Sequence, residues 1–438
     1  MKLNFTLSIL LLCFFSTLKA QEECSQRYKD KIFEKVDYTG NFVFSTNENI
    51  GGVMRDIKYD FYEPAGDTAP LRPLIILWHG GAFLDIFNKR SPDIILIAHE
   101  FVKRGYTVIS ADYRGVKNAF DLLKEKEIVK EVVRSVIDGN DLICKIMDDI
   151  NNNGNPHRIN KDEIFAGGVS GGAILGMHLM YIKSLDQMPG EYKKWALEVD
   201  NGGGEIALQN KFCSPNPIKG FISISGAILD TAWIQKSDMS LLIFHGGIDN
   251  LVPYEYAQPL FGAKDLPYVY GGKLIHEQAQ RVGINTTFID YPERGHVPYM
   301  NITGTNVMEL IQEVSNGLIN DEIFIKDMQT MTDFLSSQVE CEKIVVEPTA
   351  LRPINSIAIN LYPNPVNDYF EIQLPESKKW NINILDVSGR SVLQNQFVGN
   401  QYQQLAKNLS PGMYVVQISN SDEPEKVFIG KIVQQKLD

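Results

Sequence analysis

Along residues 36–340, short apolar runs alternate with longer stretches in which apolar residues recur every three or four positions. The runs are typical of strands buried on both faces of a sheet, and the longer stretches are typical of helices. The predicted strands are Lys58–Tyr62, Leu74–Trp78, Thr107–Ala111, Glu163–Gly167, Phe221–Ser225, Leu241–Phe244 and Thr287–Tyr291, and the predicted helices are Ser91–Arg104, Glu127–Ile150 and Ala173–Ile182. Repeated strand–helix units predict an α/β domain with a doubly wound, mostly parallel sheet.

Three segments depart from this alternation. Met188–Pro217 is rich in glycine and asparagine, which predicts a loop or lid insertion. Val345–Pro353 holds two prolines and predicts a linker, after which short strands separated by turns predict a small β-sandwich. Met1–Ala20 has the basic start, apolar run and small final residue of a secretory signal peptide. The expected parts are a signal peptide at 1–20, an α/β domain at 21–343, a linker at 344–356 and a β-sandwich at 357–438.

The composition narrows the class of protein. Of 438 residues, 44% are hydrophobic and 22% charged, so the chain can bury a large core and is not mainly disordered. The formal net charge is −12, whereas a nucleic-acid-binding protein normally carries a basic face. No apolar run reaches the ~20 residues of a membrane span. We therefore expect an exported protein, secreted or attached to the cell surface, with no transmembrane segment and no nucleic-acid partner.

Four cysteines follow the predicted signal peptide, namely Cys24, Cys144, Cys213 and Cys341. An even number in an oxidising compartment predicts disulfides, and four cysteines allow three pairings. We favour Cys24–Cys341, which would join the two ends of the domain, with Cys144–Cys213 inside that loop. Buried free thiols are the alternative. A metal site is not expected, because no short spacing of cysteine and histidine accompanies these residues.

The sequence Gly168-x-Ser170-x-Gly172 lies between a predicted strand and a predicted helix. In such a turn the serine hydroxyl stands out of the sheet, and glycines are needed because helix and strand approach too closely for Cβ atoms. A glycine-rich turn with an incidental serine is the alternative. The strand before the turn and the helix after it favour a nucleophile.

A nucleophilic serine needs a base to accept its proton and an acid to orient that base. Asp249 and His296 each follow a later predicted strand, and open α/β sheets place their sites at these strand ends. The chain order Ser170, Asp249, His296 therefore predicts a catalytic triad. The alternative bases and acids lie in settings that fit these roles less well; they are His99, His178, His245, His276, Asp230, Asp238 and Asp290.

An oxyanion hole is predicted beside this serine. Gly80 and Gly81 directly follow the predicted strand Leu74–Trp78, and Gly171 follows the serine. Their main-chain N–H groups are expected to converge on the developing oxyanion, where one donor is worth about 3 kcal/mol. An ordinary Gly-Gly turn is the alternative. Aromatic side chains are candidates for the substrate pocket, with core packing as the alternative; they are Trp78, Phe83, Trp233, Tyr254 and Tyr299.

Residues 40–338 resemble the α/β-hydrolase fold, in the carboxylesterase and lipase group with a His-Gly-Gly oxyanion motif. Besides the motifs above, the matching landmarks are Asp60-Phe61-Tyr62-Glu63-Pro64, Arg104-Gly105-Tyr106 and Asp112-Tyr113-Arg114. The resemblance implies ester hydrolysis through an acyl-enzyme without a cofactor, and a structural role for Asp112 and Arg114. Ala82 replaces the group's usual third glycine, and Val169 stands where the hormone-sensitive-lipase branch has an acidic residue. The chain thus looks more similar to secreted esterases that remove acetyl or feruloyl groups from carbohydrates.

Four further motifs follow one another in the C-terminal region: Leu361-Tyr362-Pro363-Asn364-Pro365-Val366, Leu385-Asp386-Val387-Ser388-Gly389-Arg390, Leu409-Ser410-Pro411-Gly412-Met413-Tyr414 and Lys431-Ile432-Val433. Residues 357–438 resemble the type A sorting domain of the type IX secretion system of Bacteroidota. The resemblance implies that the type IX machinery is a partner and carries the chain across the outer membrane. A small carbohydrate-binding sandwich is the alternative.

The sequence as a whole predicts a secreted serine carboxylic-ester hydrolase that acts on a small-molecule or polysaccharide ester. A lipase or polyester hydrolase with the same machinery is one alternative. A non-catalytic surface-binding protein on a hydrolase scaffold is another, since a fold does not fix a function. The intact order of serine, aspartate and histidine argues against the binding protein.

Overall fold

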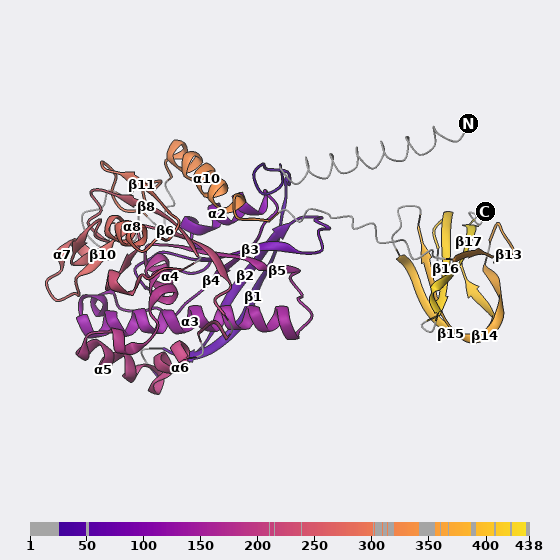
Figure 1. Ribbon diagram of the computed structural model, residues 1–438, viewed down its shortest axis with the longest axis horizontal. Helices are drawn as coiled ribbons and strands as arrows, with labels where there is room; N and C mark the ends of the chain where they lie inside the picture. The colour runs from indigo at the N-terminus through magenta and orange to yellow at the C-terminus, as the bar shows by residue number, and fades with distance from the viewer. Residues whose placement is uncertain are drawn as a thin grey trace. The chain divides into compact units, whose positions relative to one another are not determined.

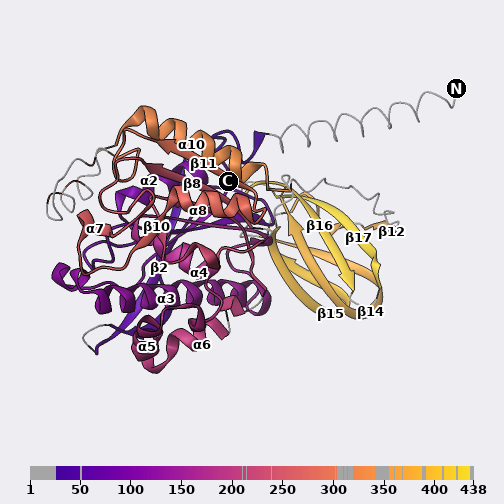
Figure 2. The same cartoon turned by 60° about the vertical axis from the view of Figure 1, so that its left-hand side comes forward.

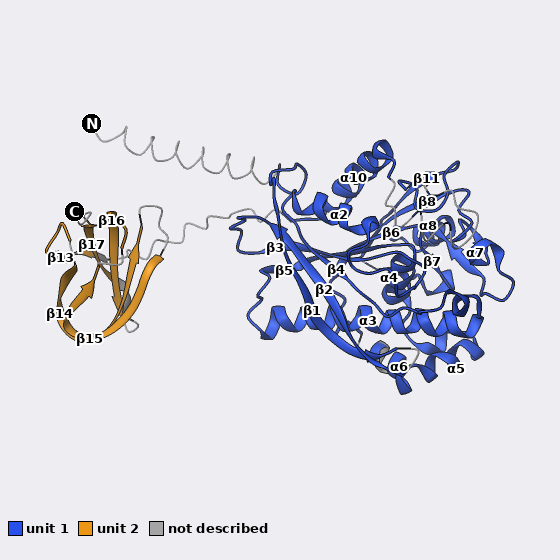
Figure 3. Cartoon of the chain, turned by 180° about the vertical axis from the view of Figure 1, so that it is seen from behind, with its two compact units in different colours: residues 1–343 blue, residues 344–438 orange. Residues whose placement is uncertain are grey.

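The computed structural model of the chain is shown in Figure 1. It describes residues 26–49, 52–209, 211–213, 215–237, 239–300, 302, 309, 313, 319–340, 355–359, 361–366, 368–386, 391–406, 409–420 and 423–434. The chain divides into two compact units, residues 1–343 and 344–438 (Figure 3). The predicted signal peptide, most of the predicted linker, Cys24 and Cys341 lie outside the described residues.

The first unit is built on an eight-stranded sheet with the order β1-β2-β4-β3-β5-β6-β8-β11 in its described residues. The strands β1 and β2 pair antiparallel, and β2 is antiparallel to β4, whereas the strands from β4 to β11 run parallel. The bounds are β1 Val36–Glu48, β2 Met54–Pro64, β3 Arg72–Trp78, β4 Thr107–Ala111, β5 Ile159–Val169, β6 Ile218–Ile224, β8 Ser240–Gly246 and β11 Thr286–Tyr291. The predicted doubly wound, mostly parallel sheet is confirmed.

Helices cover both faces of this sheet (Figures 1 and 2). On one face lie α3 (Glu125–Asn152), α4 (Gly171–Tyr181) and α8 (Gly272–Arg281), and on the other lie α2 (Pro92–Val102) and α10 (Asp321–Ser336). The core is divided in the same way. Leu74 and Ile76 of β3 pack on the side of α3, and Ile75 and Leu77 pack on the side of α2. Because successive strand residues point to opposite faces, a strand buried on both faces must be apolar throughout.

The segment Met188–Pro217 is largely helical, so the prediction of a loop was wrong. It holds α5 (Gly190–Glu198), η3 (Val199–Asn201), α6 (Gly203–Gln209) and η4 (Lys211–Cys213), and η2 (Leu185–Gln187) precedes it. Its glycine and asparagine serve the junctions between short helices: Asn201 and Gly202 have φ of 51° and 91°. Such left-handed conformations end a helix, and the same residue types are typical of loops.

The helical segment packs against α3 (Figure 1), where Ala196 and Val199 are buried with Val133 and Ile137. A disulfide joins Cys144 of α3 to Cys213. This pair is one half of the pairing expected from the sequence.

The remaining described elements of the first unit are short. They are η1 (Ala119–Leu123), β7 (Ala227–Ile228), η5 (Thr231–Trp233), β9 (Tyr256–Ala257), α7 (Pro259–Gly262) and β10 (Val269–Gly271). The strands β7, β10 and β9 form a small antiparallel sheet of their own.

In the second unit the described strands form one connected, mostly antiparallel sheet, in which the long β14 pairs with β13, β15 and β16. The strands are β12 (Asn355–Ala358), β13 (Leu361–Tyr362), β14 (Tyr369–Leu385), β15 (Ser391–Leu405), β16 (Gly412–Asn420) and β17 (Glu423–Gln434). The sheet encloses its own core around Phe370, Trp380 and Phe428. The predicted C-terminal β region is present, and its described strands belong to one connected sheet.

Arg114 connects the segment after β4 to α3 and to the helical segment. Its Nε donates to Asp138 Oδ1 at 2.9 Å, and its Nη1 donates to Asp200 Oδ2 at 2.8 Å and to the Glu48 carbonyl at 2.8 Å. Arg114 and Asp138 are both fully buried. A buried charge that loses its partner lowers the stability of the fold, so this network fixes the position of α3 against the sheet.

We expect Arg114→Ala to lower the free energy of unfolding of the first unit by about 3–5 kcal/mol, because Asp138 stays buried without its counter-ion. Urea unfolding of the full chain measures this loss. Lys161→Ala is the control: it breaks the exposed pair with Asp162 and should cost less than about 1 kcal/mol. Equal effects of the two variants would contradict the proposed role of Arg114.

Candidate active site

Ser170 occupies a sharp turn between β5 and α4. Its φ of 51° lies in a region that residues with a side chain rarely adopt. A Cβ atom on Gly168 would lie 2.4 Å from the Gly172 carbonyl carbon, and one on Gly172 would lie 2.2 Å from the Trp78 oxygen. Both positions therefore require glycine. The Ser170 N–H donates to the Ile224 carbonyl at 2.8 Å, which ties the turn to β6.

The structure brings Ser170, His296 and Asp249 together, although 126 and 47 residues separate the successive partners. The Ser170 hydroxyl donates to His296 Nε2 at 2.8 Å, and His296 Nδ1–H donates to Asp249 Oδ2 at 2.7 Å. Asp249 Oδ1 accepts the N–H groups of Leu251 and Val252 at 2.9 and 3.0 Å. All three side chains are buried. The arrangement can move a proton from the hydroxyl to the imidazole.

A second histidine contacts the same aspartate. His245 Nδ1 accepts the Gly272 N–H at 3.2 Å, so the ring proton sits on Nε2. That nitrogen lies 3.1 Å from the Val252 carbonyl and 3.3 Å from Asp249 Oδ2. From the sequence His245 is interpreted as a structural residue. Its contact with Asp249 depends on how the loop after β8 turns back, for which the sequence holds no signal.

The charge of Asp249 is fixed by its surroundings. Burial alone would raise the pKa of this carboxyl, but the facing His296 and His245 hold the pKa well below its ordinary value. The carboxylate therefore stays ionised and can orient and stabilise a protonated His296.

The oxyanion prediction needs a correction at Gly80. Its N–H donates to Asp93 Oδ2 at 2.6 Å, so this donor is already engaged. The next turn instead carries two non-glycine residues with positive φ, Ala82 at 51° and Phe83 at 59°. A Cβ atom on Gly171 would lie 3.6 Å from the Ala82 nitrogen and 3.4 Å from the Phe83 nitrogen. The main-chain nitrogens of Ala82 and Phe83 thus lie beside Gly171, the residue after the serine. The sequence prediction named Gly80, Gly81 and Gly171 as the donors.

Asp93, in the first turn of α2, is a functional candidate that sequence reasoning missed. It is fully buried and lies in the wall of the cavity at Ser170. Burial raises the pKa of its carboxyl to about 6, although the Gly80 and Ile94 N–H groups and the nearby His296 favour the ionised form. The sequence indicates only an acidic residue at a helix start, because the contact with Gly80 is set by tertiary packing.

A cavity of about 170 Å³ opens at Ser170 and His296, with Gly81, Gly171 and Phe83 in its wall. Phe83 is the one predicted pocket aromatic that lines it; Trp78, Trp233, Tyr254 and Tyr299 do not.

Those four aromatic residues pack elsewhere. Trp78 is buried in the core beneath α3 and α4, and Trp233 packs edge-on against His178. Tyr254 packs against His245, and the Tyr299 hydroxyl donates to the Asp93 carbonyl at 2.9 Å. Residue type alone does not tell a pocket aromatic from a packed one, so the sequence prediction named all five.

Two of the other alternative residues make contacts outside the triad. His276 stacks on Phe288, and Asp230 caps η5 by accepting the Ala232 N–H. Asp238 lies outside the described residues. Within the described residues, no three acidic, histidine or cysteine side chains cluster as metal ligands would. The described helices are all too short or too polar to cross a membrane.

The strand order and the turn at Ser170 define the first unit as an α/β-hydrolase fold. Residues 59–206 match the family model BD-FAE, and residues 360–434 match the secretion system C-terminal sorting domain. No curated protein matches the chain. Among solved structures, Thermogutta terrifontis esterase 2 phosphorylated by paraoxon is 17% identical, with a TM-score of 0.39 over 67% of this chain and 94% of that one. The butyrate-bound form of that esterase is also 17% identical, with a TM-score of 0.38 over 69% and 97%.

Because the pKa of Asp93 is raised to about 6, we expect the free energy of unfolding to depend on pH. The Asp93 carboxyl binds its proton more tightly in the folded chain than in the unfolded chain. The stability that the protonated carboxyl contributes is therefore lost as the pH rises from about 4 to about 6. We expect the unfolding free energy of the wild type, relative to Asp93→Asn, to fall by about 3 kcal/mol across that window.

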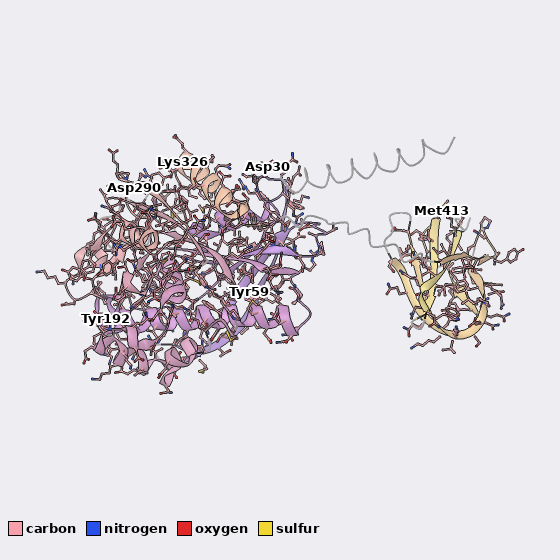
Figure 4. The ribbon with its side chains drawn as sticks, in the orientation of Figure 1. Asp30, Tyr59, Tyr192, Asp290, Lys326 and Met413 are labelled. Carbon is pink, nitrogen blue, oxygen red and sulfur yellow. A yellow bond between two sulfur atoms is a disulfide. The ribbon has the colours of Figure 1, made fainter. Side chains whose placement is uncertain are left out.

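Urea unfolding at several pH values measures this difference. Asp30→Asn is the control, since Asp30 is exposed (Figure 4) and its variant should show no such trend. A difference between wild type and Asp93→Asn that does not change with pH would contradict the buried, late-ionising carboxyl.

Proposed function

We propose that the chain is a secreted serine carboxylic-ester hydrolase. The observation that carries the proposal is the unbroken hydrogen-bonded line from Ser170 through His296 to Asp249 at a cavity. Ser170 Oγ attacks the ester carbonyl carbon while His296 Nε2 takes the hydroxyl proton. His296 then gives that proton to the departing alcohol oxygen, which leaves an acyl-serine. Water, activated by the same imidazole, attacks the acyl-serine and frees the acid and Ser170.

The oxyanion is held by main-chain N–H groups of Gly171, Ala82 and Gly81 in this proposal. Gly80 does not contact the oxyanion in this proposal. Its hydrogen bond to Asp93 positions the following turn, in which Gly81 and Ala82 have positive φ. Each proton of the cycle moves between Ser170, His296, alcohol and water, so the proposed reaction uses no cofactor.

The substrate class follows from the reaction and from similarity. An acyl ester of a small molecule or polysaccharide, of the acetyl or feruloyl type, is consistent with the match of residues 59–206 to BD-FAE. A lipase or polyester hydrolase would use the same residues. A non-catalytic binding protein would not need the Ser170–His296–Asp249 geometry.

The second unit supports the route of export. Its match to a secretion sorting domain, together with the motifs around Pro363 and Gly412, supports recognition by the type IX machinery.

We expect a chain truncated after residue 343 to accumulate in the periplasm of a Bacteroidota host, whereas the full chain reaches the surface or medium. Cell fractionation and immunoblotting measure this, and equal export of both chains would contradict the sorting role.

We expect Ser170→Ala to lower kcat/KM for nitrophenyl esters by at least about 10⁴-fold and to abolish labelling by a fluorophosphonate. Both effects arise because no nucleophile remains. Ser337→Ala, an exposed serine on the surface, is the matched control and should retain activity and labelling. A wild-type chain that neither hydrolyses esters nor reacts with the fluorophosphonate would contradict the proposed function.

A further inference from the structure

The cavity at Ser170 offers almost no polar partner to a substrate. Among the described residues that line it, only Asp93, Ser170, His178 and His296 have polar side chains. Ser170 and His296 are the reacting pair of the proposed function. Asp93 Oδ2 accepts the Gly80 N–H, and Asp93 Oδ1 is buried without a hydrogen-bond partner.

His178 is fully engaged. Its Nδ1–H donates to the Ile174 carbonyl at 2.8 Å, and its Nε2 accepts the Leu229 N–H at 3.2 Å. Burial lowers the pKa of His178 to about 4, so the ring is neutral at pH 7.

The remaining wall is hydrocarbon from several elements. One face of α3 contributes Val129, Val132, Val133 and Val136, whose spacing places them on a single side of the helix. Met188, at the start of the helical segment, and Leu185, just before it, line the same cavity. Figures 1 and 2 show α3 beside α4, which begins at the nucleophile turn. The cavity therefore reaches from the reacting atoms to α3, and Ile174 and His178 of α4 also line it.

We propose, resting on the proposed function, that this cavity holds the acyl group, and that this group is an unsubstituted hydrocarbon chain of about six carbons. A cavity of about 150 Å³ lined by similar side chains binds benzene, so about 170 Å³ suits a group of that size. The acyl group remains attached to Ser170 through both steps, so it can stay in the apolar cavity. The alcohol must leave and water must enter, so we place the alcohol on the open side.

This inference replaces the acetyl or feruloyl group considered above with a longer, unsubstituted acyl group. An acetyl group would leave most of the cavity unfilled. Among the polar side-chain atoms of the described lining residues, Asp93 Oδ1 alone is buried without a partner, so a feruloyl group could pair its phenolic hydroxyl only there. Away from that atom its hydroxyl would be buried unpaired, which opposes binding.

The first test measures kcat/KM of the full chain for nitrophenyl esters from acetate to palmitate. We expect a rise of about fourfold for each added methylene up to hexanoate, since each is buried, and a fall beyond octanoate. Two isomeric esters separate the acyl from the alcohol side: ethyl hexanoate should be hydrolysed at least tenfold faster than hexyl acetate. Methyl hexanoate should likewise exceed methyl ferulate.

Two variants of α3 test the location. Val132→Phe fills the cavity and should lower the hexanoate-to-acetate ratio of kcat/KM at least tenfold. Ile128→Ala enlarges the cavity and should move the optimum to longer chains. Val43→Phe places the same substitution on exposed β1 and should leave the ratio unchanged.

The outcomes separate the two proposals. An optimum at acetate, a preference for hexyl acetate or for methyl ferulate, or a ratio unchanged in both α3 variants overturns the acyl-cavity inference and leaves the esterase function standing. Hydrolysis of no ester together with no fluorophosphonate labelling overturns the proposed function itself.

Discussion

The close approach of α4 to the strand ends of β3 and β5 determines the geometry of the site. Gly172 sits where any side chain would collide with the Trp78 carbonyl, and Gly168 sits where one would collide with Gly172. This contact forces Ser170 into a positive φ and lifts its hydroxyl above the sheet. The loops after β8 and β11 then bring Asp249 and His296 to the same edge, because parallel strands end together there.

Buried polar contacts behind the reacting atoms hold this geometry. Asp249 accepts main-chain donors from Leu251 and Val252 and lies beside His245, so its carboxylate cannot rotate freely. Asp93 fixes Gly80 from the opposite side. Both carboxylate oxygens of Asp249 and the Oδ2 of Asp93 thus face donors, which is the condition under which a polar group can remain in an apolar interior.

The sequence predicted the features that repeat along the chain. Strands buried on both faces appear as apolar runs, and Ser170, Asp249 and His296 each follow such a run, so their meeting could be inferred. Features set by side-chain direction could not be inferred. The N–H of Gly80 donates to Asp93, and Trp78 packs in the core. Gly202 lies at a junction between short helices, but glycine is equally common in loops, so the sequence did not distinguish the two. The contact of His245 with Asp249 belongs to the same group.

The Cys144–Cys213 disulfide has a consequence for where the molecule matures. It ties α3 to the last helix of the helical segment, Met188–Pro217. Met188, at the start of this segment, and Leu185, just before it, line the cavity. A disulfide forms and persists only in an oxidising compartment. Inside a reducing cytoplasm that segment is held by packing alone, and oxidation after export adds the covalent tether. The compartment, as well as the amino-acid sequence, thus sets how firmly this side of the cavity is held.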